Sequence, residues 1–529
     1  MTPPMHTEDN PLAVQLERIE NHLRERRAQE AESLAALFVE ENPRIIDGWL
    51  LLSRARLALM QYEAALDAVE KAAALDGKHA GAQLQRIDAL MRCGRSKDAL
   101  EAAKKVETER KFDPAVLLQI GLFYSRTNRR VDAAHCYERV RVLQPANRSA
   151  IYRLATAYSA LGELDKAEAL LDELLRKDSR EFDAYHNRSM LRRQTTEHNH
   201  IADMEKVLAS AKPGDTAEIP LCYSLAKELE DVGEWKRAFS YLKRGADARK
   251  RQVAYDVRGD IAVLDEIRRT FDESFFAQVR PGDGDESPFF VLGMPRSGTS
   301  LVDRIISSHS EVGSVGESDE FSQIVSRRTH QGDSRAKVEF QRCRELDFKA
   351  VGREFCDSIN GLLPGCPRLL DKTTGNFMYV GLILTALPNA KIVHVRRDPV
   401  DSCYAVYKAL FRRGSHYSYD LEDTGNYYLA YLRLMDHWRR LLPGRFLDID
   451  YEELVDEQEA VTRRMIAFCG LEWEGACLFF EKNPSPLLTA SAAQVRQPIY
   501  SSSVGLWRHY EEELQPLVRI LREGGVEIA

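Results

Sequence analysis

The stretch GMPRSGTS begins at Gly293, directly after the apolar run FFVL, and combines residue types that bind an anion. Gly293 and Gly298 permit backbone conformations in which N–H groups approach a ligand closely. Arg296 adds a fixed positive charge, and the hydroxyl donors are Ser297, Thr299 and Ser300. The next residues, LVDRIISS, predict a helix whose positive amino-terminal end points at the same place. The pattern therefore predicts an anion-binding loop between a strand and a helix.

The loop lacks the lysine of a nucleoside-triphosphate site. In the pattern G-x-x-x-x-G-K-[ST] a lysine precedes the Ser or Thr, whereas Thr299 follows Gly298 directly. The sequence also offers no obvious carboxylate partner for Mg²⁺. We therefore expect an anion that carries neither a metal nor a γ-phosphate. The alternative is an ordinary turn with a Ser/Thr cap.

A second basic site follows another strand-like run, in KIVHVRRDPVDS. Arg396 and Arg397 stand at the end of the run, and Asp398–Pro399 opens a helix. The two arginines are either surface salt-bridge partners or, beside an anion loop in the same sheet, a grip for a second phosphate. A metal-free ligand with phosphates at two separated points is 3′-phosphoadenosine 5′-phosphosulfate (PAPS), the sulfuryl donor.

Several ordered segments resemble the sulfotransferase family, most closely its bacterial tetratricopeptide-repeat members and the tyrosylprotein sulfotransferases. The resemblance covers residues 289–317, 369–405, 445–455 and about 488–510. The segments read PRSGTSLVDRIISSHSEVGSVGE, LLDKTTGNF, VHVRRDPVDSC, DYEELV and SAAQVRQPIYSSSVGLWRHY. The resemblance implies a PAPS-dependent sulfotransferase domain that uses no metal.

The resemblance also assigns donor-binding residues. The 5′-phosphosulfate would be held by Arg296, Ser297, Gly298, Thr299 and Ser300. The 3′-phosphate would be held by Arg397, with further donor contacts from Tyr451, Ser501 and Trp507. The sequence departs from the family here, because the serine expected eight residues after the arginine is Ala405. Ser402 lies one helical turn earlier and is expected to substitute, since residues three apart share a helix face.

The family reaction is in-line transfer of SO₃ to a hydroxyl group. It needs a base for the acceptor proton and positive charge at the leaving oxygen. Glu317 stands where the tyrosylprotein enzymes carry their catalytic glutamate, past a predicted turn with two glycines. Lys372 and Ser491 match the residues that stabilise the transferring group and the bridging oxygen, and Arg296 joins them as a catalytic residue.

Each of these assignments has a plainer alternative. Glu317 would be a solvated loop carboxylate, Lys372 a surface lysine paired with Asp371, and Ser491 a turn serine. His309 is the alternative base, because small-molecule sulfotransferases use a histidine. Its place after LVDRIISS, however, predicts a residue at a helix end.

The amino-terminal half contains an internal repeat. Alanines recur every 34 residues, at positions 31, 65, 99, 133 and 167, with large apolar or aromatic companions at matching offsets. The period is that of the tetratricopeptide repeat (TPR), in which a small residue lets paired helices approach closely. It blurs near residues 182–212 and predicts roughly six helix pairs. We expect the array to bind a protein or peptide, and the alternative is self-association, including a homodimer.

These patterns predict an α-solenoid over residues 12–250, a helical linker over 251–287 and an α/β domain with a mainly parallel sheet over 288–529. The predicted strands are FFVLG, RLLDK, KIVHVRR and RFLDIDYEEL, alternating with helices. The formal net charge of −8 indicates no nucleic-acid partner, and no stretch is long and apolar enough to span a membrane. Nine scattered cysteines and the absence of a signal pattern favour the reducing cytoplasm.

The predicted function is therefore PAPS-dependent transfer of a sulfuryl group to a hydroxyl acceptor, with the repeats recruiting that acceptor. The acceptor is a protein tyrosine, a glycan, a lipid or a small alcohol, and the sequence does not distinguish them. The rival interpretations are a phosphoryl-transfer enzyme and a repeat scaffold with a non-catalytic nucleotide-binding domain.

Overall fold

The computed structural model describes residues 11–211, 216–282, 284, 288–330, 338–411, 414–485 and 494–528. These residues form two compact units. Unit 1 contains the chain up to Phe123 and the segments Glu320–Leu346 and Arg353–Pro364. Unit 2 contains Tyr124–Asp319, Asp347–Gly352 and the chain from Gly365 onward. The domain boundaries expected from the sequence stay a prediction.

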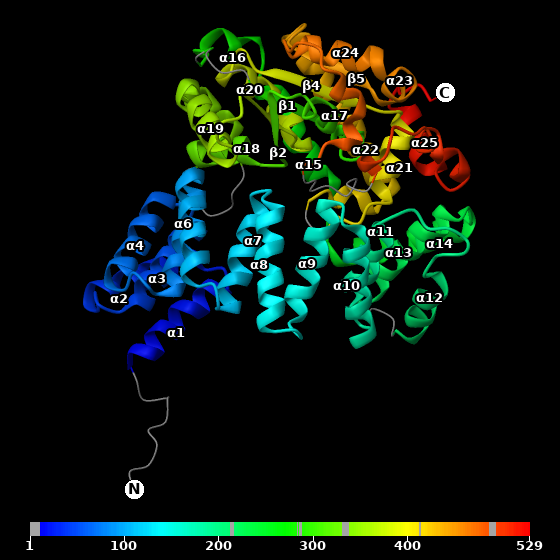
Figure 1. Cartoon of the computed structure of the whole chain (residues 1–529). Coiled ribbons are helices and arrows are strands. Elements are labelled where there is room, and N and C mark those ends of the chain that lie inside the picture. Colours follow the sequence, from blue (N-terminus) through cyan, green and yellow to red (C-terminus); the bar gives the residue numbers. More distant parts are fainter. Residues whose placement is uncertain are drawn as a thin grey trace. The chain divides into compact units, whose positions relative to one another are not determined.

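Fourteen consecutive helices occupy the described residues between 11 and 252 (Figure 1). They are α1 (Pro11–Arg24), α2 (Ala28–Glu41), α3 (Ile46–Ala58), α4 (Tyr62–Leu75), α5 (Ala80–Arg92), α6 (Ser96–Glu109), α7 (Pro114–Arg126), α8 (Arg130–Leu143), α9 (Arg148–Leu161), α10 (Leu164–Lys177), α11 (Phe182–Met190), α12 (Ile201–Ser210), α13 (Glu218–Asp231) and α14 (Trp235–Gln252). The five periodic alanines lie on the second helix of successive pairs, and each is 0% exposed. The predicted α-solenoid is confirmed, because the small side chains sit where helices approach closely.

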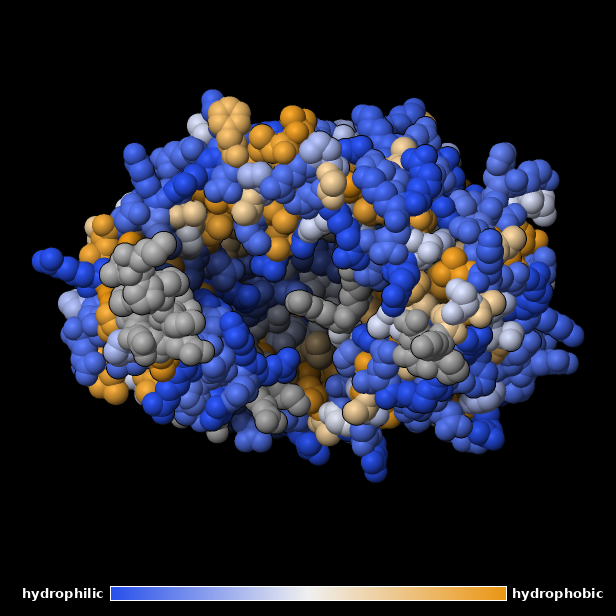
Figure 2. All heavy atoms as spheres, turned by 90° about the horizontal axis from the view of Figure 1, so that it is seen from below, coloured by the Kyte–Doolittle hydropathy of each residue, from blue (hydrophilic) through white to orange (hydrophobic). Residues whose placement is uncertain are grey.

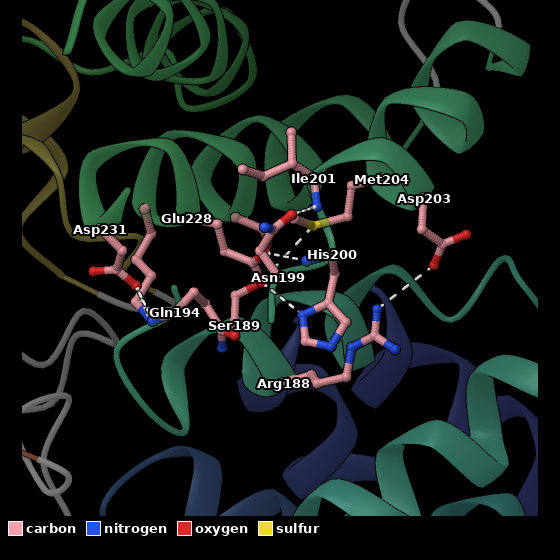
Figure 3. Close-up of polar contacts among 12 residues, drawn as sticks. Arg188, Ser189, Gln194, Asn199, His200, Ile201, Asp203, Met204, Glu228 and Asp231 are labelled. Atoms are coloured by element: carbon pink, nitrogen blue, oxygen red, sulfur yellow. Dashed lines mark hydrogen bonds and ion pairs between the residues drawn. The ribbon is translucent and has the colours of Figure 1, made fainter. Parts of the chain in front are cut away.

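The irregular stretch between α11 and α12 is held by two carboxylates of α13, the buried Glu228 and the partly buried Asp231 (Figure 3). Glu228 accepts hydrogen bonds from Ser189 Oγ at 2.6 Å and from the backbone N–H of His200 at 2.6 Å. Asp231 accepts one from the backbone N–H of Gln194 at 2.8 Å. Side-chain acceptors here replace regular helix pairing, which explains why the 34-residue period blurs. The short α11 and α12 both pack against α13, and they add two helices to the roughly six pairs that the sequence predicted.

Two helices follow the array and pack into unit 2. They are α15 (Val257–Thr270) and α16 (Glu273–Gln278). Phe271 and Phe275 are fully buried, and their ring centroids lie 4.7 Å apart. The Phe271 ring also lies 6.0 Å from that of Trp438 on α22 (Leu421–Leu441). The segment expected to be a linker therefore contributes to the core of unit 2.

A five-stranded sheet lies at the centre of the carboxyl-terminal half (Figure 1). Its strands, in the order β2-β3-β1-β4-β5, are all parallel. They are β1 (Phe289–Gly293), β2 (Val312–Gly316), β3 (Arg368–Asp371), β4 (Lys391–Arg396) and β5 (Phe446–Asp450). The helices of this half are α17 (Thr299–Ile306), α18 (Glu320–Thr329), α19 (Phe348–Leu362), α20 (Val380–Ala386), α21 (Pro399–Tyr407), α22, α23 (Tyr451–Asp456), α24 (Gln458–Phe468) and α25 (Gln515–Glu523). The α/β fold and four of its strands are as predicted.

The fifth strand corrects the sequence interpretation of residues 312–316. The segment VGSVG, with Gly313 and Gly316, was expected to turn, and it instead pairs with β3. Glycine and serine have low strand propensity, so the pattern gives little signal for a strand. The consequence is functional, because Glu317 now follows a strand of the same parallel sheet as the anion loop.

Alternating residues of the central strands face two different layers. Phe289 and Val291 of β1 belong to a core shared with α17, α23 and α24. On the other face, His394 of β4 lies against Tyr431 of α22, with ring centroids 5.9 Å apart. The sheet is thus covered on both faces, as parallel sheets are.

Helices α18 and α19 supply side chains to unit 1. Ser358 Oγ lies 3.1 Å from Ser96 Oγ of α6 and donates to the buried Glu320 at 2.9 Å. Arg328 donates to Glu354 at 2.8 Å. These contacts join segments far apart in the sequence within one unit.

The face drawn in Figure 2 is mainly hydrophilic, and hydrophobic side chains appear there only in small groups. Among the described residues, no helix is long and apolar enough to cross a membrane. All nine cysteines lie among the described residues, and none of them forms a disulfide bond there.

Candidate active site

The loop between β1 and α17 turns tightly against Tyr451. Gly298 has φ +106°, and a Cβ atom there would lie 2.5 Å from Cδ2 of Tyr451. A Cβ atom on Gly293 would lie 2.5 Å from the carbonyl oxygen of Val395. Arg296 adopts φ +69°, a left-handed conformation that is costly for a residue with a side chain. The loop therefore stores strain between two positions that only glycine can occupy.

The hydroxyl groups of this loop gather at the start of α17. Ser297 is 1% exposed, and its Oγ is buried without a hydrogen-bond partner. Ser300 lines a cavity with Arg296 and Gly298, and Thr299 is buried next to it in the chain. No side chain caps the first turn of α17. A buried hydroxyl without a partner and an uncapped helix start are features of an anion site.

Arg397 lines the same cavity from the end of β4. Its Nη1 donates to the carbonyl oxygen of Arg296 at 3.3 Å, and its Nη2 donates to that of Ser503. The guanidinium lies over the Tyr451 ring, 5.0 Å from the centroid, and its Nε is buried without a partner. Burial and the nearby charge of Arg397 lower the pKa of Arg296. Two cations held this close attract an anion.

The segment after residue 494 forms the opposite wall of the cavity. Ser503, rather than the predicted Ser501, makes the contacts there, since Tyr451 Oη lies 2.8 Å from Ser503 Oγ. Ser501 is exposed. Trp507 is buried, and its backbone N–H donates to Asp401 at 3.1 Å. Ser503 lies two residues beyond the predicted serine, and sequence spacing gives no means of choosing between them.

Helix α21 places Ser402 and Ala405 on different faces. Ala405 lines the first cavity with Arg397, whereas Ser402 lines a second cavity beside β4, which Ser297 and Arg397 also line. Ser402 thus shares a cavity with Arg397 and the anion loop from another face of the helix than Ala405, and its expected role at the 3′-phosphate stays a prediction. Asp401, which the sequence interpretation missed, also lines the first cavity, and its spacing of four from Arg397 is a detectable signal.

Glu317 and Lys372 meet at the carboxyl ends of neighbouring strands. Glu317 follows β2 and Lys372 follows β3, and Nζ of Lys372 lies 2.5 Å from Oε1 of Glu317. The lysine side chain is 1% exposed and the glutamate side chain 47%. Asp303 of α17 is buried nearby, and burial raises its pKa while the charge of Lys372 opposes the rise. The ion pair thus lies at the same edge of the sheet as the anion loop.

Asp371 is the last residue of β3, directly before Lys372, and its side chain is buried. It accepts hydrogen bonds from Ser318 Oγ and from Asn376 Nδ2, the latter at 3.1 Å. Burial raises the pKa of Asp371 to about 6, although hydrogen bonds from Ser318 and Thr373 oppose the shift. The alternative of Lys372 as a surface lysine paired with Asp371 does not match the observed contacts, because the lysine is buried and pairs with Glu317.

His309 lies at the amino-terminal ends of the strands, opposite to the end where Glu317 lies. It precedes β2, whereas Glu317 follows it. Its Nε2 lies 2.9 Å from the carbonyl oxygen of Glu472, and its Nδ1 accepts a hydrogen bond from the backbone N–H of Glu311. Both ring nitrogens are thus engaged in joining the end of α17 to a neighbouring loop.

Ser491 lies outside the described residues. The chain on either side of it is held by two arginines, of which Arg304 is buried and Arg496 partly buried. Arg304 of α17 donates to the carbonyl oxygen of Ser485 at 2.6 Å, and burial lowers its pKa to about 10. Arg496 donates to the carbonyl oxygen of Ala160 at 2.5 Å, at the end of repeat helix α9. Among the described residues, no His, Cys, Asp and Glu side chains converge as a metal site would.

Two family models match the chain. A model of the sulfotransferase family matches residues 288–475, and a model of the Psidin amino-terminal TPR repeat region matches residues 56–182. The chain carries a sulfotransferase-family domain. That domain contains the anion loop, Arg397, Tyr451 and the Glu317–Lys372 pair, and it follows a TPR region.

Curated relatives extend this likeness. An uncharacterized protein of Aquifex aeolicus is 30% identical over 436 residues, which is 80% of this chain and 56% of the relative. A protein-tyrosine sulfotransferase of Drosophila melanogaster is 23% identical over 240 residues, covering 41% of this chain and 46% of the relative. Protein-tyrosine sulfotransferase A of Caenorhabditis elegans is 25% identical over 217 residues, covering 39% and 56%. The chain thus spans about half the length of these relatives.

Among solved structures, a sulfotransferase domain from the curacin biosynthetic pathway matches with TM-score 0.33 and 16% identity, over 47% of this chain and 100% of that one. A thermophilic TPR protein of Thermus thermophilus matches with TM-score 0.29 and 20% identity, over 34% and 98%.

Proposed function

We propose that this protein is a sulfotransferase that moves a sulfuryl group from PAPS to a hydroxyl acceptor. The observation that carries the proposal is the pairing of Arg296 and Arg397 in one cavity beside an anion loop that lacks the nucleoside-triphosphate lysine. The sulfotransferase-family domain and the protein-tyrosine sulfotransferase relatives support it.

In this proposal the cavity residues bind the donor and the ion pair performs the transfer. The buried Ser297 hydroxyl, the start of α17 and Arg296 would hold the 5′-phosphosulfate, and Arg397 the 3′-phosphate. Thr299 and Ser300 would add hydroxyl donors to the 5′-phosphosulfate site. The Tyr451 ring packs against Gly298 of that site and lies under Arg397 of the 3′-phosphate site. Trp507 would shape the donor site through the hydrogen bond from its backbone N–H to Asp401. Ser503, which contacts Tyr451, would make the donor contact that was expected of Ser501.

Transfer would exchange one S–O bond for another. The bond from sulfur to the bridging oxygen of the donor breaks, the bond from sulfur to the acceptor oxygen forms, and the acceptor proton passes to Glu317. Lys372, which contacts the glutamate, would stabilise charge on the transferring group. Ser491 keeps its proposed role at the bridging oxygen.

The repeat array is proposed to recruit the acceptor, either a protein or a glycan. Asn128, in the turn between α7 and α8, lies 3.5 Å from where a Cβ of Gly316 would be, next to Glu317. A cavity of about 700 Å³ between α10 and α12 is lined by charged side chains, including Arg176, Arg188 and Lys206. A cytoplasmic location is proposed because the nine cysteines, all among the described residues, form no disulfide bond.

Calorimetry with 3′-phosphoadenosine 5′-phosphate tests the donor site. Binding is expected without added metal, and Arg397→Ala should weaken it by about 1.5–3 kcal/mol, the range for hydrogen bonds to charged groups. Arg396→Ala is the matched control, because that neighbour is exposed and pairs with Asp450. Equal affinity for adenosine 5′-monophosphate would contradict a 3′-phosphate site.

Transfer is tested with ³⁵S-labelled PAPS and a cell extract. Label should enter one product fraction and disappear in the Arg397→Ala protein. Labelling from γ-³²P-ATP instead would favour phosphoryl transfer, and binding without any labelling would favour the scaffold.

A further inference from the structure

Lys408, at the end of α21, faces the donor cavity. It lines that cavity with Arg397 and Ala405, and its side chain is 27% exposed. Its backbone N–H donates to the carbonyl oxygen of Tyr404 at 3.0 Å, so the helical path continues to this residue. Asp401, Ala405 and Lys408 follow the spacing i, i+4, i+7, which places them along one helix face. Ser402 lies about 100° around the same helix, on the face of the second cavity.

The charge of a phosphate makes a second cation necessary. A phosphate monoester carries about −1.5 to −2 at neutral pH, and Arg397 supplies one positive charge. Asp401 lines the same cavity and lies 3.9 Å from Arg397, so it offsets part of that charge. Arg296 is already assigned to the other end of the donor. Among the described residues that line the cavity, Lys408 is the remaining cation.

A repeat helix holds this lysine in place. Glu230 of α13 lies 2.6 Å from Lys408 Nζ and also accepts hydrogen bonds from Tyr404 at 2.6 Å and from Tyr510 at 3.1 Å. Burial opposes ionisation of Glu230, but the charge of Lys408 and these hydrogen bonds outweigh it, so the pKa of Glu230 is lowered. The helix itself is fixed on its other side, where Glu228 and Asp231 hold the irregular stretch (Figure 3).

We propose that Lys408 is the second cation for the phosphate on the donor ribose, oriented by Glu230 of the repeat array. The inference rests on the proposed function and deepens it, because the array then completes the donor site in addition to recruiting an acceptor. The proposal also accounts for Ala405, which stands where the family carries a serine. Lys408, one helical turn later on the same face, would supply the phosphate contact expected from that serine.

The test compares the affinities of 3′-phosphoadenosine 5′-phosphate and adenosine 5′-monophosphate for the full chain by calorimetry without metal. Lys408→Met should reduce the preference for the bisphosphate by on the order of ten- to a hundredfold, and leave the monophosphate affinity within about twofold. Glu230→Gln keeps an oxygen acceptor for the lysine and should retain most of the preference. The double variant Glu230→Gln/Lys408→Met leaves no buried unpaired charge, so it carries the test if Lys408→Met does not fold.

Lys250→Met is the matched control. Lys250 also tethers a repeat helix to the carboxyl-terminal half, through Asp420 at 2.7 Å, but it does not line the cavity. Its loss should leave the preference unchanged. An unchanged preference in the double variant, or an equal loss of both ligands, would overturn the role of Lys408. Failure of the unaltered protein to prefer the bisphosphate would instead refute the proposed donor site, and this inference with it.

Discussion

At the scale of single residues, the two members of the Glu317–Lys372 ion pair differ in how far they are exposed to solvent. The lysine side chain is 1% exposed and the carboxylate side chain 47%. A buried ammonium requires a partner, because desolvation disfavours its charge. The half-exposed carboxylate meets that requirement while keeping one side open to solvent. This arrangement suits a base that must be ionised yet accessible.

Glu317→Gln tests the base directly. The amide keeps the shape and an oxygen for Lys372 but loses basicity, so donor binding should be nearly unchanged. The transfer rate should fall by on the order of 10²–10⁴-fold. Glu311→Gln, before the same strand, is the control and should retain full activity. Equal losses of donor affinity and rate would indicate a structural role, and full activity beside an inactive His309→Ala would give the base role to the histidine.

Asp371 predicts a pH dependence of stability. Burial raises its pKa to about 6, against 3.8 in an unstructured chain. Because the folded state then binds the proton more tightly, stability falls as the pH rises from about 4 to about 6, by up to about 3 kcal/mol. Asp371→Asn should remove this slope and raise the melting temperature above pH 6. Thermal melts across pH 4–8 measure both effects, and an unaltered slope in the variant would show that other groups cause it.

At the scale of elements, prediction from sequence succeeded where one face is buried. Period-34 alanines and apolar runs such as FFVL identify the solenoid and four strands, because burial imposes a pattern. β2 left no pattern, since VGSVG carries little apolar surface. Ser501 and Ser503 show the same limit within the site, because a motif gives spacing along the chain but not which of two nearby side chains faces the cavity. Lys408 was missed because its partner Glu230 lies 178 residues away.

Gly298→Ala tests the packing of the anion loop. The new Cβ would meet Tyr451 at 2.5 Å from a backbone with φ +106°. Strain and overpacking should together cost on the order of 1–3 kcal/mol and displace the loop, weakening 3′-phosphoadenosine 5′-phosphate binding. Gly444→Ala is the control, because φ there is +73° but no atom lies within 4 Å of the new Cβ. Thermal melts and calorimetry on both proteins separate backbone strain from the clash. Equal behaviour of the two variants would exclude a special role for the contact with Tyr451.

At the scale of the whole molecule, unit 2 joins part of the repeat array to the sulfotransferase-family domain. Trp235 of α14 stacks on His509, with ring centroids 3.9 Å apart, and Phe271 packs near Trp438. A fragment beginning at residue 288 would expose these buried aromatic surfaces. Loss of activity in such a fragment could therefore result from misfolding. The role of the array is better tested by substituting exposed residues in the full chain.

The double variant Arg176→Glu/Lys206→Glu tests recruitment by the array. Both side chains are exposed and line the cavity between α10 and α12, far along the chain from the donor residues. Reversing their charge should repel an acidic acceptor segment while leaving the fold intact. We expect unchanged calorimetric binding of 3′-phosphoadenosine 5′-phosphate and a loss of ³⁵S labelling in cell extract of tenfold or more, on the order of two charged contacts. Lys166→Glu, an exposed lysine of α10 outside that cavity, should label normally. Normal labelling by the double variant would show that these two cations do not recruit the acceptor, and a parallel loss of donor binding would show that the change disturbs the fold.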